Sequence, residues 1–134
     1  MSRYPGHLPA GKVNEDFLTV LELFPSFTKL AGATLPEEVI YDGFDFLPVL
    51  AGEVSSPRKE MFWERRDQQA ARIGNYKWVK SSRGGGLFDL DSDPGEKHDL
   101  SKSNPEILSQ IKQRFRDWKS EMNASEPRGP FRDY

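Results

Sequence analysis

Cysteine is missing altogether from this sequence of 134 residues. Its absence excludes disulfide bonds, thiolate metal sites and a cysteine nucleophile, and it leaves the cellular compartment open. Long apolar runs are missing too, because no stretch approaches the roughly 18 residues of a membrane-spanning helix. The first residues also lack the apolar segment of a signal peptide. We therefore expect no membrane partner.

An excess of positive charge is also lacking. The chain has 19 Lys and Arg residues against 21 Asp and Glu residues, which gives a formal net charge of −2. Binding to nucleic acid or to an anionic membrane surface requires clustered excess Lys and Arg. Nucleic acid is therefore not an expected partner.

What the sequence does contain is a set of aromatic residues large enough to build a small core. Phe, Tyr and Trp contribute 9, 4 and 3 residues, although only 36% of the chain is apolar and 30% is charged. Disordered chains are poor in such residues, and a chain of this length accommodates one domain. A small folded unit is therefore expected.

The first half is rich in proline and glycine, so its elements are expected to be short. A helix is predicted over residues 23–31, because apolar residues recur at helical spacing, a proline falls in the first turn and a glycine follows the end. Residues 13–21 are ambiguous, because Phe17, Val20 and Leu21 would also suit a helix, but the break at Pro25 favours an extended chain. Residues 44–50 are predicted to form a short helical turn that ends at Gly52.

The second half has the pattern of a small antiparallel sheet. Four short strands are predicted, over residues 60–64, 69–73, 76–81 and 87–90. Gly74 and Asn75 form a two-residue hairpin signal between the second and third of them. The glycine-rich segment 81–86 is predicted to be a flexible connection.

The clearest helical signal comes last in the chain. Pro105 suits a first helical position, and one apolar stripe follows it, made of Ile107, Ile111, Phe115, Trp118 and Met122. This helix is expected to cover one face of the sheet, and residues 123–134 are expected to form an irregular tail. The predicted fold class is therefore α+β, a small antiparallel four-stranded sheet covered by a C-terminal helix.

Reasoning from single residues finds no catalytic or metal site. No Ser-His-Asp set or metal-ligand cluster is evident, and the acidic run at residues 89–95 has Pro94 where a calcium loop requires glycine, so it is interpreted as a turn. Basic residues gather on or near the strands among Trp63, Tyr76 and Trp78. They are Arg58, Arg65, Arg66, Arg72, Lys77 and Lys80, and they form either a solvated face or a surface that holds sulfate or phosphate.

Five segments in one order add a further observation. The first three are Tyr-Pro-Gly-His-Leu-Pro-Ala-Gly at 4–11, Leu-Phe-Pro-Ser-Phe-Thr-Lys-Leu-Ala-Gly at 23–32, and Asp-Gly at 42–43 with Leu-Pro-Val-Leu at 47–50 and Gly52. The fourth is Phe-Trp-Glu at 62–64 followed by Ala-Arg-Ile-Gly-Asn-Tyr-Lys-Trp-Val at 71–79, and the fifth is Leu-Phe-Asp-Leu at 87–90 with Asp-Pro-Gly-Glu at 93–96 and Asp-Leu at 99–100. Together they resemble the C-terminal part of the type I sulfatase family, the arylsulfatase and N-acetylgalactosamine-6-sulfatase-like enzymes. The resemblance covers roughly residues 4–122. Arg65 stands where the family commonly has a histidine.

The resemblance implies a parent enzyme with an alkaline-phosphatase-like α/β domain that hydrolyses sulfate esters with a formylglycine and a calcium ion. In the family, the nucleophile and the metal carboxylates precede the segment with which this chain opens, so no catalytic residue, metal ligand or cofactor is assigned here. Residues 1–56 are expected to be a remnant of the large domain, 57–122 the antiparallel subdomain and 123–134 the tail.

Two functions remain open at this point. The first is a C-terminal fragment of a sulfatase, inactive alone, whose strand face forms part of the substrate rim through Arg72, Lys77 and Trp63. Its expected partner is the missing N-terminal catalytic portion or a second copy, covering an exposed apolar patch at Phe24, Phe27, Leu30, Phe46 and Leu47. The alternative is a free-standing binding or assembly module for an anionic ligand such as a sulfated glycan.

Overall fold

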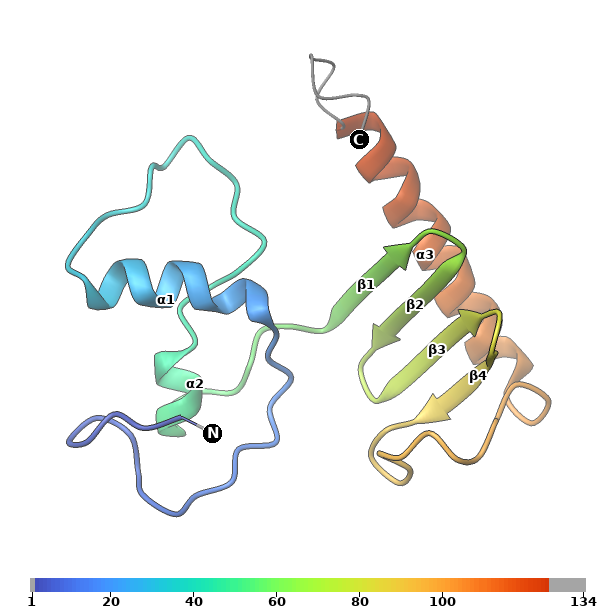
Figure 1. The fold of residues 1–134 in the computed structure, drawn as a ribbon, viewed down its shortest axis with the longest axis horizontal. Coiled ribbons are helices and arrows are strands. Elements are labelled where there is room, and N and C mark those ends of the chain that lie inside the picture. The colour runs from blue at the N-terminus through green and yellow to red at the C-terminus, as the bar shows by residue number, and fades with distance from the viewer. Residues whose placement is uncertain (1, 126–134) are drawn as a thin grey trace. The chain divides into compact units, whose positions relative to one another are not determined.

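The computed structural model describes residues 2–125, which form two compact units (Figure 1). Within the described residues, unit 1 comprises 2–59 and unit 2 comprises 60–125. Unit 1 contains η1 (Val20–Glu22), α1 (Leu23–Leu30) and α2 (Leu47–Ala51). Unit 2 contains β1 (Glu60–Arg65), β2 (Gln68–Ile73), β3 (Tyr76–Ser81), β4 (Gly84–Asp89) and α3 (Pro105–Ser125). The predicted α+β class is confirmed. The assignment of residues 1–56 to a large parent domain stays a prediction.

Helix α1 forms and ends as its sequence predicts. Pro25 lies in the first turn, and the helix stops before Gly32, whose φ of +72° suits glycine. The N–H of Gly32 donates to the carbonyl of Lys29 at 3.0 Å, and that of Ala33 donates to Thr28 at 3.1 Å. This pair of hydrogen bonds is the Schellman arrangement, which satisfies carbonyl groups at the end of a helix.

The extended conformation predicted for residues 13–21 is wrong at its end. Val20 and Leu21 belong to η1, a single 3-10 turn that leads directly into α1. Thr19 caps this turn: its hydroxyl accepts from the N–H of Leu21, and the carboxylate of Glu22 accepts from the N–H of Thr19. This reciprocal capping box stabilises the turn, so the helical alternative that the apolar spacing also allowed holds for Val20 and Leu21.

The expected apolar patch of unit 1 is only partly exposed. Phe24 is 61% exposed, Phe27 56% and Leu30 44%, so one side of α1 has little cover. Phe46 and Leu47 are half-buried instead, since the N–H of Phe46 donates to the Ser26 hydroxyl and draws the start of α2 against α1.

The sheet of unit 2 is an antiparallel meander with the order β1-β2-β3-β4. Its central row pairs Phe62 with Ala71, Ala71 with Trp78 and Trp78 with Leu87. Gly74, with φ of +58°, opens the two-residue turn between β2 and β3, as predicted. Because alternate residues of a strand point to opposite faces, this row places four apolar side chains on one face.

The fourth strand begins earlier than predicted. Gly84–Asp89 is strand throughout, so the flexible connection expected over 81–86 shrinks to Ser82 and Arg83. Glycine is required in this strand because a Cβ on Gly85 would lie 2.2 Å from the Val79 carbonyl oxygen, and a Cβ on Gly86 would lie 2.5 Å from Oδ1 of Asp99. Glycine in a strand often marks such a close approach of the backbone.

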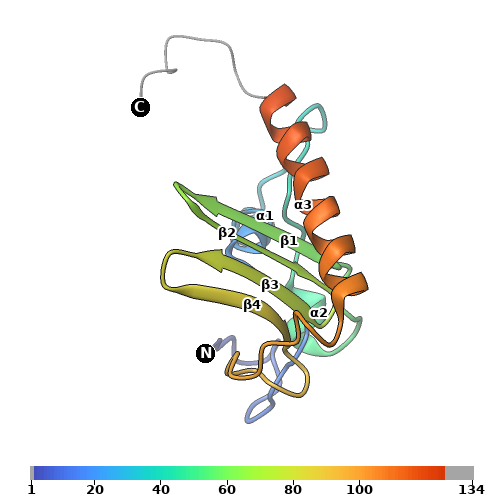
Figure 2. The same cartoon turned by 90° about the vertical axis from the view of Figure 1, so that its right-hand side faces the viewer.

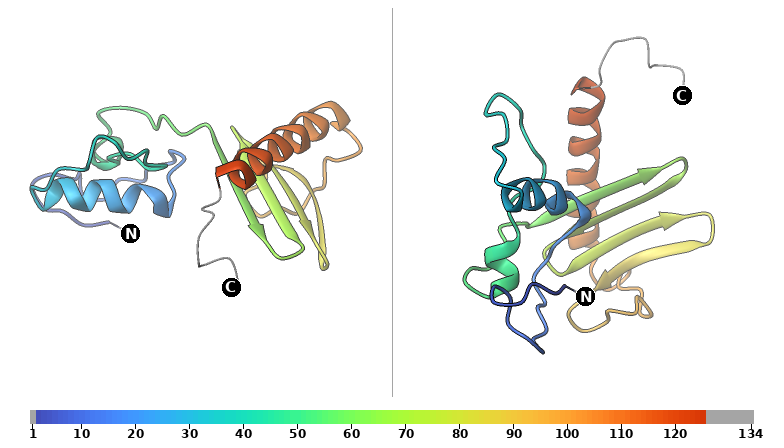
Figure 3. Two further views of the ribbon diagram at one scale, coloured as in Figure 1. Left: turned by 90° about the horizontal axis from the view of Figure 1, so that it is seen from above. Right: turned by 60° about the vertical axis from the view of Figure 1, so that its left-hand side comes forward.

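Helix α3 lies across one face of the sheet, as Figures 2 and 3 show from several sides. The buried core between them consists of Phe62, Ala71, Trp78, Leu87, Ile111 and Phe115. Ile107 and Trp118 pack against this core, whereas Met122 of the predicted stripe is 44% exposed because the last turns of α3 extend beyond the sheet (Figure 2).

The prediction that an irregular tail begins at residue 123 is wrong. Asn123, Ala124 and Ser125 continue α3, and the Ser125 hydroxyl donates to the Glu121 carbonyl at 2.9 Å. Residues 126–134, the rest of that expectation, lie outside the part of the chain that the structure describes.

Candidate functional site

The three candidate rim residues lie on one face of the sheet. Trp63, Arg72 and Lys77 come from β1, β2 and β3, and each is next in sequence to a residue that faces α3. Strand alternation therefore places all three on the face turned away from α3, which we call the outer face. Arg72 and Lys77 are direct cross-strand partners. Their role at a substrate rim stays a prediction.

The two cations of the outer face, Arg72 and Lys77, are each held by a partner within the protein. Nε of Arg72 donates to the Gly74 carbonyl at 3.0 Å, and partial burial lowers the pKa of Arg72 from its ordinary value. Nζ of Lys77 forms an ion pair with Oε1 of Glu96 at 2.5 Å. Trp63 is 41% exposed, so its ring offers an apolar surface on the same face.

Two apolar residues complete the row that contains the cations. Met61 pairs with Arg72, and Phe88 pairs with Lys77, so the row crosses all four strands. Phe88 is only 8% exposed even though it points away from α3. The outer face therefore has two adjacent basic residues in the middle of this row, with an apolar residue on either side.

The larger basic cluster predicted on or near the strands does not form one surface. Lys80, Tyr76 and Trp78 have the same parity as the core row, so they point toward α3. Arg58 is not part of the sheet, because it belongs to unit 1 and pairs there with Glu22. The chain thus divides the predicted cluster among two faces and a second unit.

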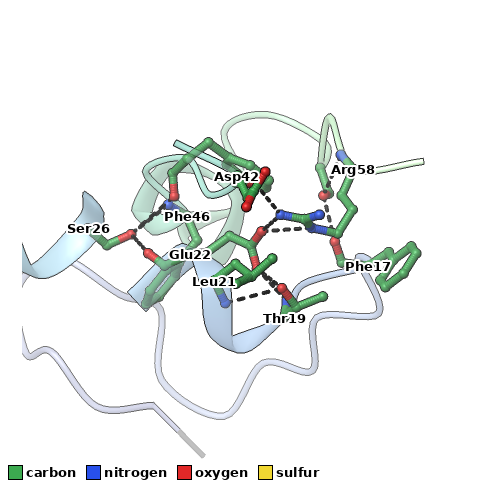
Figure 4. A network of polar contacts seen from close by, with 10 residues as sticks. Phe17, Thr19, Leu21, Glu22, Ser26, Asp42, Phe46 and Arg58 are labelled. Atoms are coloured by element: carbon green, nitrogen blue, oxygen red, sulfur yellow. Dashed lines mark hydrogen bonds and ion pairs between the residues drawn. The ribbon is translucent and has the colours of Figure 1, made fainter. Parts of the chain in front are cut away.

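Figure 4 shows the polar network that holds Arg58. Its Nε donates to Oε1 of Glu22 at 2.7 Å, and its Nη2 donates to the Asp42 carbonyl at 2.8 Å. The Ser26 hydroxyl donates to the carbonyl of Glu22 at 2.7 Å and accepts from the N–H of Phe46 at 2.9 Å. This network was not predicted from the sequence, although the Thr-x-x-Glu spacing at 19–22 is the sequence signal of its capping box.

The acidic turn after β4 satisfies its own backbone. Oδ2 of Asp93 accepts from the N–H groups of Lys97 and His98, both at 2.8 Å, and these bonds lower the pKa of Asp93 below its ordinary range. The turn interpretation of this segment therefore holds. Among residues 2–125, no three or more His, Cys, Asp or Glu side chains are grouped so that they could hold a metal ion.

No helix in the described part of the chain is long and apolar enough to cross a bilayer. No model of a protein family matches the sequence.

Human arylsulfatase A is 32% identical over 95% of this chain, and N-acetylgalactosamine-6-sulfatase from Sus scrofa is 26% identical over 81%. The chain corresponds to the C-terminal part of sulfatases.

Solved structures agree with this sulfatase assignment. The structure of Ps i-CgsB in complex with k-i-k-neocarrahexaose is 30% identical, matches 86% of this chain and has a TM-score of 0.71. A putative sulfatase from Bacteroides thetaiotaomicron is 26% identical over 80% of the chain, with a TM-score of 0.56. The chain covers 31% of human arylsulfatase A and 27% of Ps i-CgsB, so it spans less than a third of the length of these relatives.

Proposed function

We propose that this chain is the C-terminal part of a sulfatase, inactive alone, and that its outer face supplies part of the substrate rim. The observation that carries the proposal is the placement of Trp63, Arg72 and Lys77 on one face of the sheet. A guanidinium and an ammonium group can hold sulfate oxygens, and the indole ring offers an apolar contact beside them. The hydrolysis itself is assigned to residues outside this chain.

A saccharide substrate is supported by one relative. Ps i-CgsB, 30% identical to this chain, has been solved with k-i-k-neocarrahexaose, which is a statement about that protein. For this chain we propose the same broad class, a sulfated saccharide, whose sulfate would meet Arg72 and Lys77. Glu96 would then exchange its ion pair with Lys77 for a contact between Lys77 and the ligand.

The partner that we propose is the catalytic portion of the enzyme. Phe24, Phe27 and Leu30 are each at least 44% exposed on one helix of eight residues. Contiguous exposed apolar groups mark surfaces that are covered in the functional protein. A catalytic portion seated on α1 would remove them from water and would join unit 1 to the remainder of the enzyme.

The first test compares the chain alone with a chimera. The 134-residue chain should not hydrolyse 4-nitrophenyl sulfate in the presence of calcium. The chain fused in place of the matching C-terminal part of Ps i-CgsB should hydrolyse it, provided that the chimera is monomeric and melts cooperatively. Hydrolysis by the chain alone would contradict the proposal.

The rim is tested in the same chimera with a sulfated carrageenan oligosaccharide. Arg72→Gln and Lys77→Gln should each raise KM several-fold with little change in kcat, because both charges act in binding. Trp63→Ala should act in the same direction. Lys102→Gln, which removes an exposed charge beyond the sheet, is the matched control and should leave KM unchanged. Equal KM values in all four variants would exclude the outer face from the rim.

The free-standing module stays the second candidate, because unit 2 has a core of its own under α3. This function predicts that the 134-residue chain binds the sulfated oligosaccharide without a catalytic portion. Binding by the isolated chain that Arg72→Gln abolishes, together with an inactive chimera, would favour the module over the fragment.

A further inference from the structure

Unit 2 contains a hollow on the side opposite to the outer face. It has a volume of about 600 Å³ and lies between α3 and the β3–β4 hairpin. On the side of β4, the hollow is lined by Gly84, Gly85 and Gly86. Gly85 has the parity of Lys80 and faces α3, and a Cβ there would lie 2.2 Å from the Val79 carbonyl oxygen, so this strand lines the hollow with backbone alone.

Four basic side chains line this hollow. Three of them, Lys112, Arg116 and Lys119, are four and three residues apart on α3, a spacing that places them on one side of a helix. The fourth is Lys80 of β3, which pairs with Gly85 and points toward α3. We call this site the basic hollow.

Most of this positive charge is not neutralised by the protein. Lys119 forms an ion pair with Glu64 at 2.5 Å. Lys112 lies over the ring of Trp78, 5.7 Å from its centroid, and Arg116 donates to the amide oxygen of Gln113. Within residues 2–125, no carboxylate forms an ion pair with Lys80, Lys112 or Arg116.

Asp99, the acidic residue that lines the hollow, already accepts hydrogen bonds from neighbouring groups of the protein. Oδ1 of Asp99 accepts from the N–H of Leu87 at 3.0 Å, from the N–H of Ser101 at 2.8 Å and from the hydroxyl of Ser101 at 2.5 Å. These three bonds hold the carboxylate at the edge of β4. With four basic side chains against Asp99 and the Glu64 that pairs with Lys119, the basic hollow keeps an excess of positive charge on a chain whose formal net charge is −2.

We propose that the basic hollow binds an oxyanion group, a sulfate or phosphate, carried by an anionic ligand. Arginine and lysine are the side chains that hold such groups, and glycines let a ligand approach the backbone. The hollow lies on the α3 side of the sheet, so it is a second anion site that is distinct from the outer face. It requires no hydrolytic activity, and it can be tested by binding alone.

Nuclear magnetic resonance of the full 134-residue chain tests the proposal. The probes are sodium sulfate, sodium phosphate and a heparin-derived hexasaccharide, with sodium chloride of equal ionic strength and an unsulfated hyaluronan hexasaccharide as references. The amide signals of Gly84, Gly85 and Gly86 and the indole signal of Trp78 should shift in a saturable manner. Saturation by the inorganic ions identifies a simple oxyanion site, whereas saturation only by the hexasaccharide identifies a sulfated saccharide site, and both outcomes support the proposal.

A double variant assigns the binding to the hollow. Lys112→Gln together with Arg116→Gln should weaken binding about tenfold, since each solvent-accessible charge contributes modestly to affinity. Lys12→Gln together with Lys97→Gln removes the same charge elsewhere and should have no such effect. Loss of the Trp78 core would be visible in the spectrum of the free variant, which separates unfolding from lost binding.

Two outcomes overturn the proposal. The first is that no probe shifts the signals of the three glycines more than sodium chloride does. The second is that shifts appear only at Arg72 and Lys77, which would place the anion on the outer face. The proposed rim can fail in the chimera while the hollow still binds, so the two proposals fail separately.

Discussion

Glu22 accepts a hydrogen bond of 2.7 Å from Nε of Arg58, 36 residues further along the chain, and its side chain has no exposure to solvent. The guanidinium is also nearly buried, with 10% of its side chain exposed. The pair therefore connects the start of α1 to the last residues of unit 1. Removing one member of such a pair leaves the other buried and uncompensated, which is strongly destabilising.

Replacing Glu22 with Gln should destabilise unit 1 by about 3 kcal/mol, because Arg58 would remain buried without its counter-charge. All Trp residues lie in unit 2, so tryptophan fluorescence would not report on the unfolding of unit 1. The measurement is therefore amide hydrogen exchange of α1, followed by mass spectrometry. Glu37→Gln changes an exposed carboxylate and serves as the control. Equal exchange rates of α1 in the wild type and E22Q would show that the pair contributes little.

The core of unit 2 should depend on Phe115. This side chain is 2% exposed and lies 5.4 Å from the ring centroids of both Trp78 and Trp118. Phe115→Ala should lower the free energy of unfolding by about 3–5 kcal/mol, measured by tryptophan fluorescence in urea. Met122→Ala, at an exposed position of the same helix, should cost less than about 1 kcal/mol.

Strand β4 should not accept a methyl group at Gly85. A Cβ on Gly85 would lie 2.2 Å from a backbone oxygen of Val79, which cannot rotate away as a side chain could. Gly85→Ala should therefore destabilise unit 2 by about 1–3 kcal/mol in the same urea experiment. Ser82→Ala, in the adjacent turn, should be close to neutral, and a fully stable G85A would contradict the register of β3 and β4.

Acid should weaken unit 2 through Asp99. Hydrogen bonds from the Ser101 hydroxyl, the Leu87 N–H and the Ser101 N–H hold the pKa of Asp99 below its ordinary range. The unfolded chain therefore binds the proton more readily, so the stabilisation is complete at neutral pH and is lost as the pH falls below about 4.

The measurement is the urea midpoint of unit 2 between pH 7 and pH 2.5. Asp99→Asn cannot ionise, so its midpoint should fall less steeply with pH than that of the wild type. Asp67→Asn, at an exposed turn position, is the control and should keep the wild-type slope. An unchanged slope in D99N would mean that other carboxylates carry the pH dependence.

The sequence by itself determined the elements that local chemistry specifies. β3 spans the predicted residues, Gly74 opens the predicted turn and Pro105 begins the last helix. Each of these depends on contacts within a few residues, such as a positive φ or a missing N–H. The order of the family-like segments also indicated the C-terminal part of sulfatases, which the comparisons confirm.

Only the tertiary structure decided which distant residues meet. Gly85 belongs to a strand because it pairs with Lys80 of β3, and Arg58 is not part of the predicted basic cluster because it pairs with Glu22 in unit 1. The sequence places Lys80 and Lys77 in one basic cluster, yet strand alternation puts them on opposite faces, and Lys80 lines the hollow with the cations of α3 instead. Register and packing create these juxtapositions, and neither is encoded in the spacing of residues within one element.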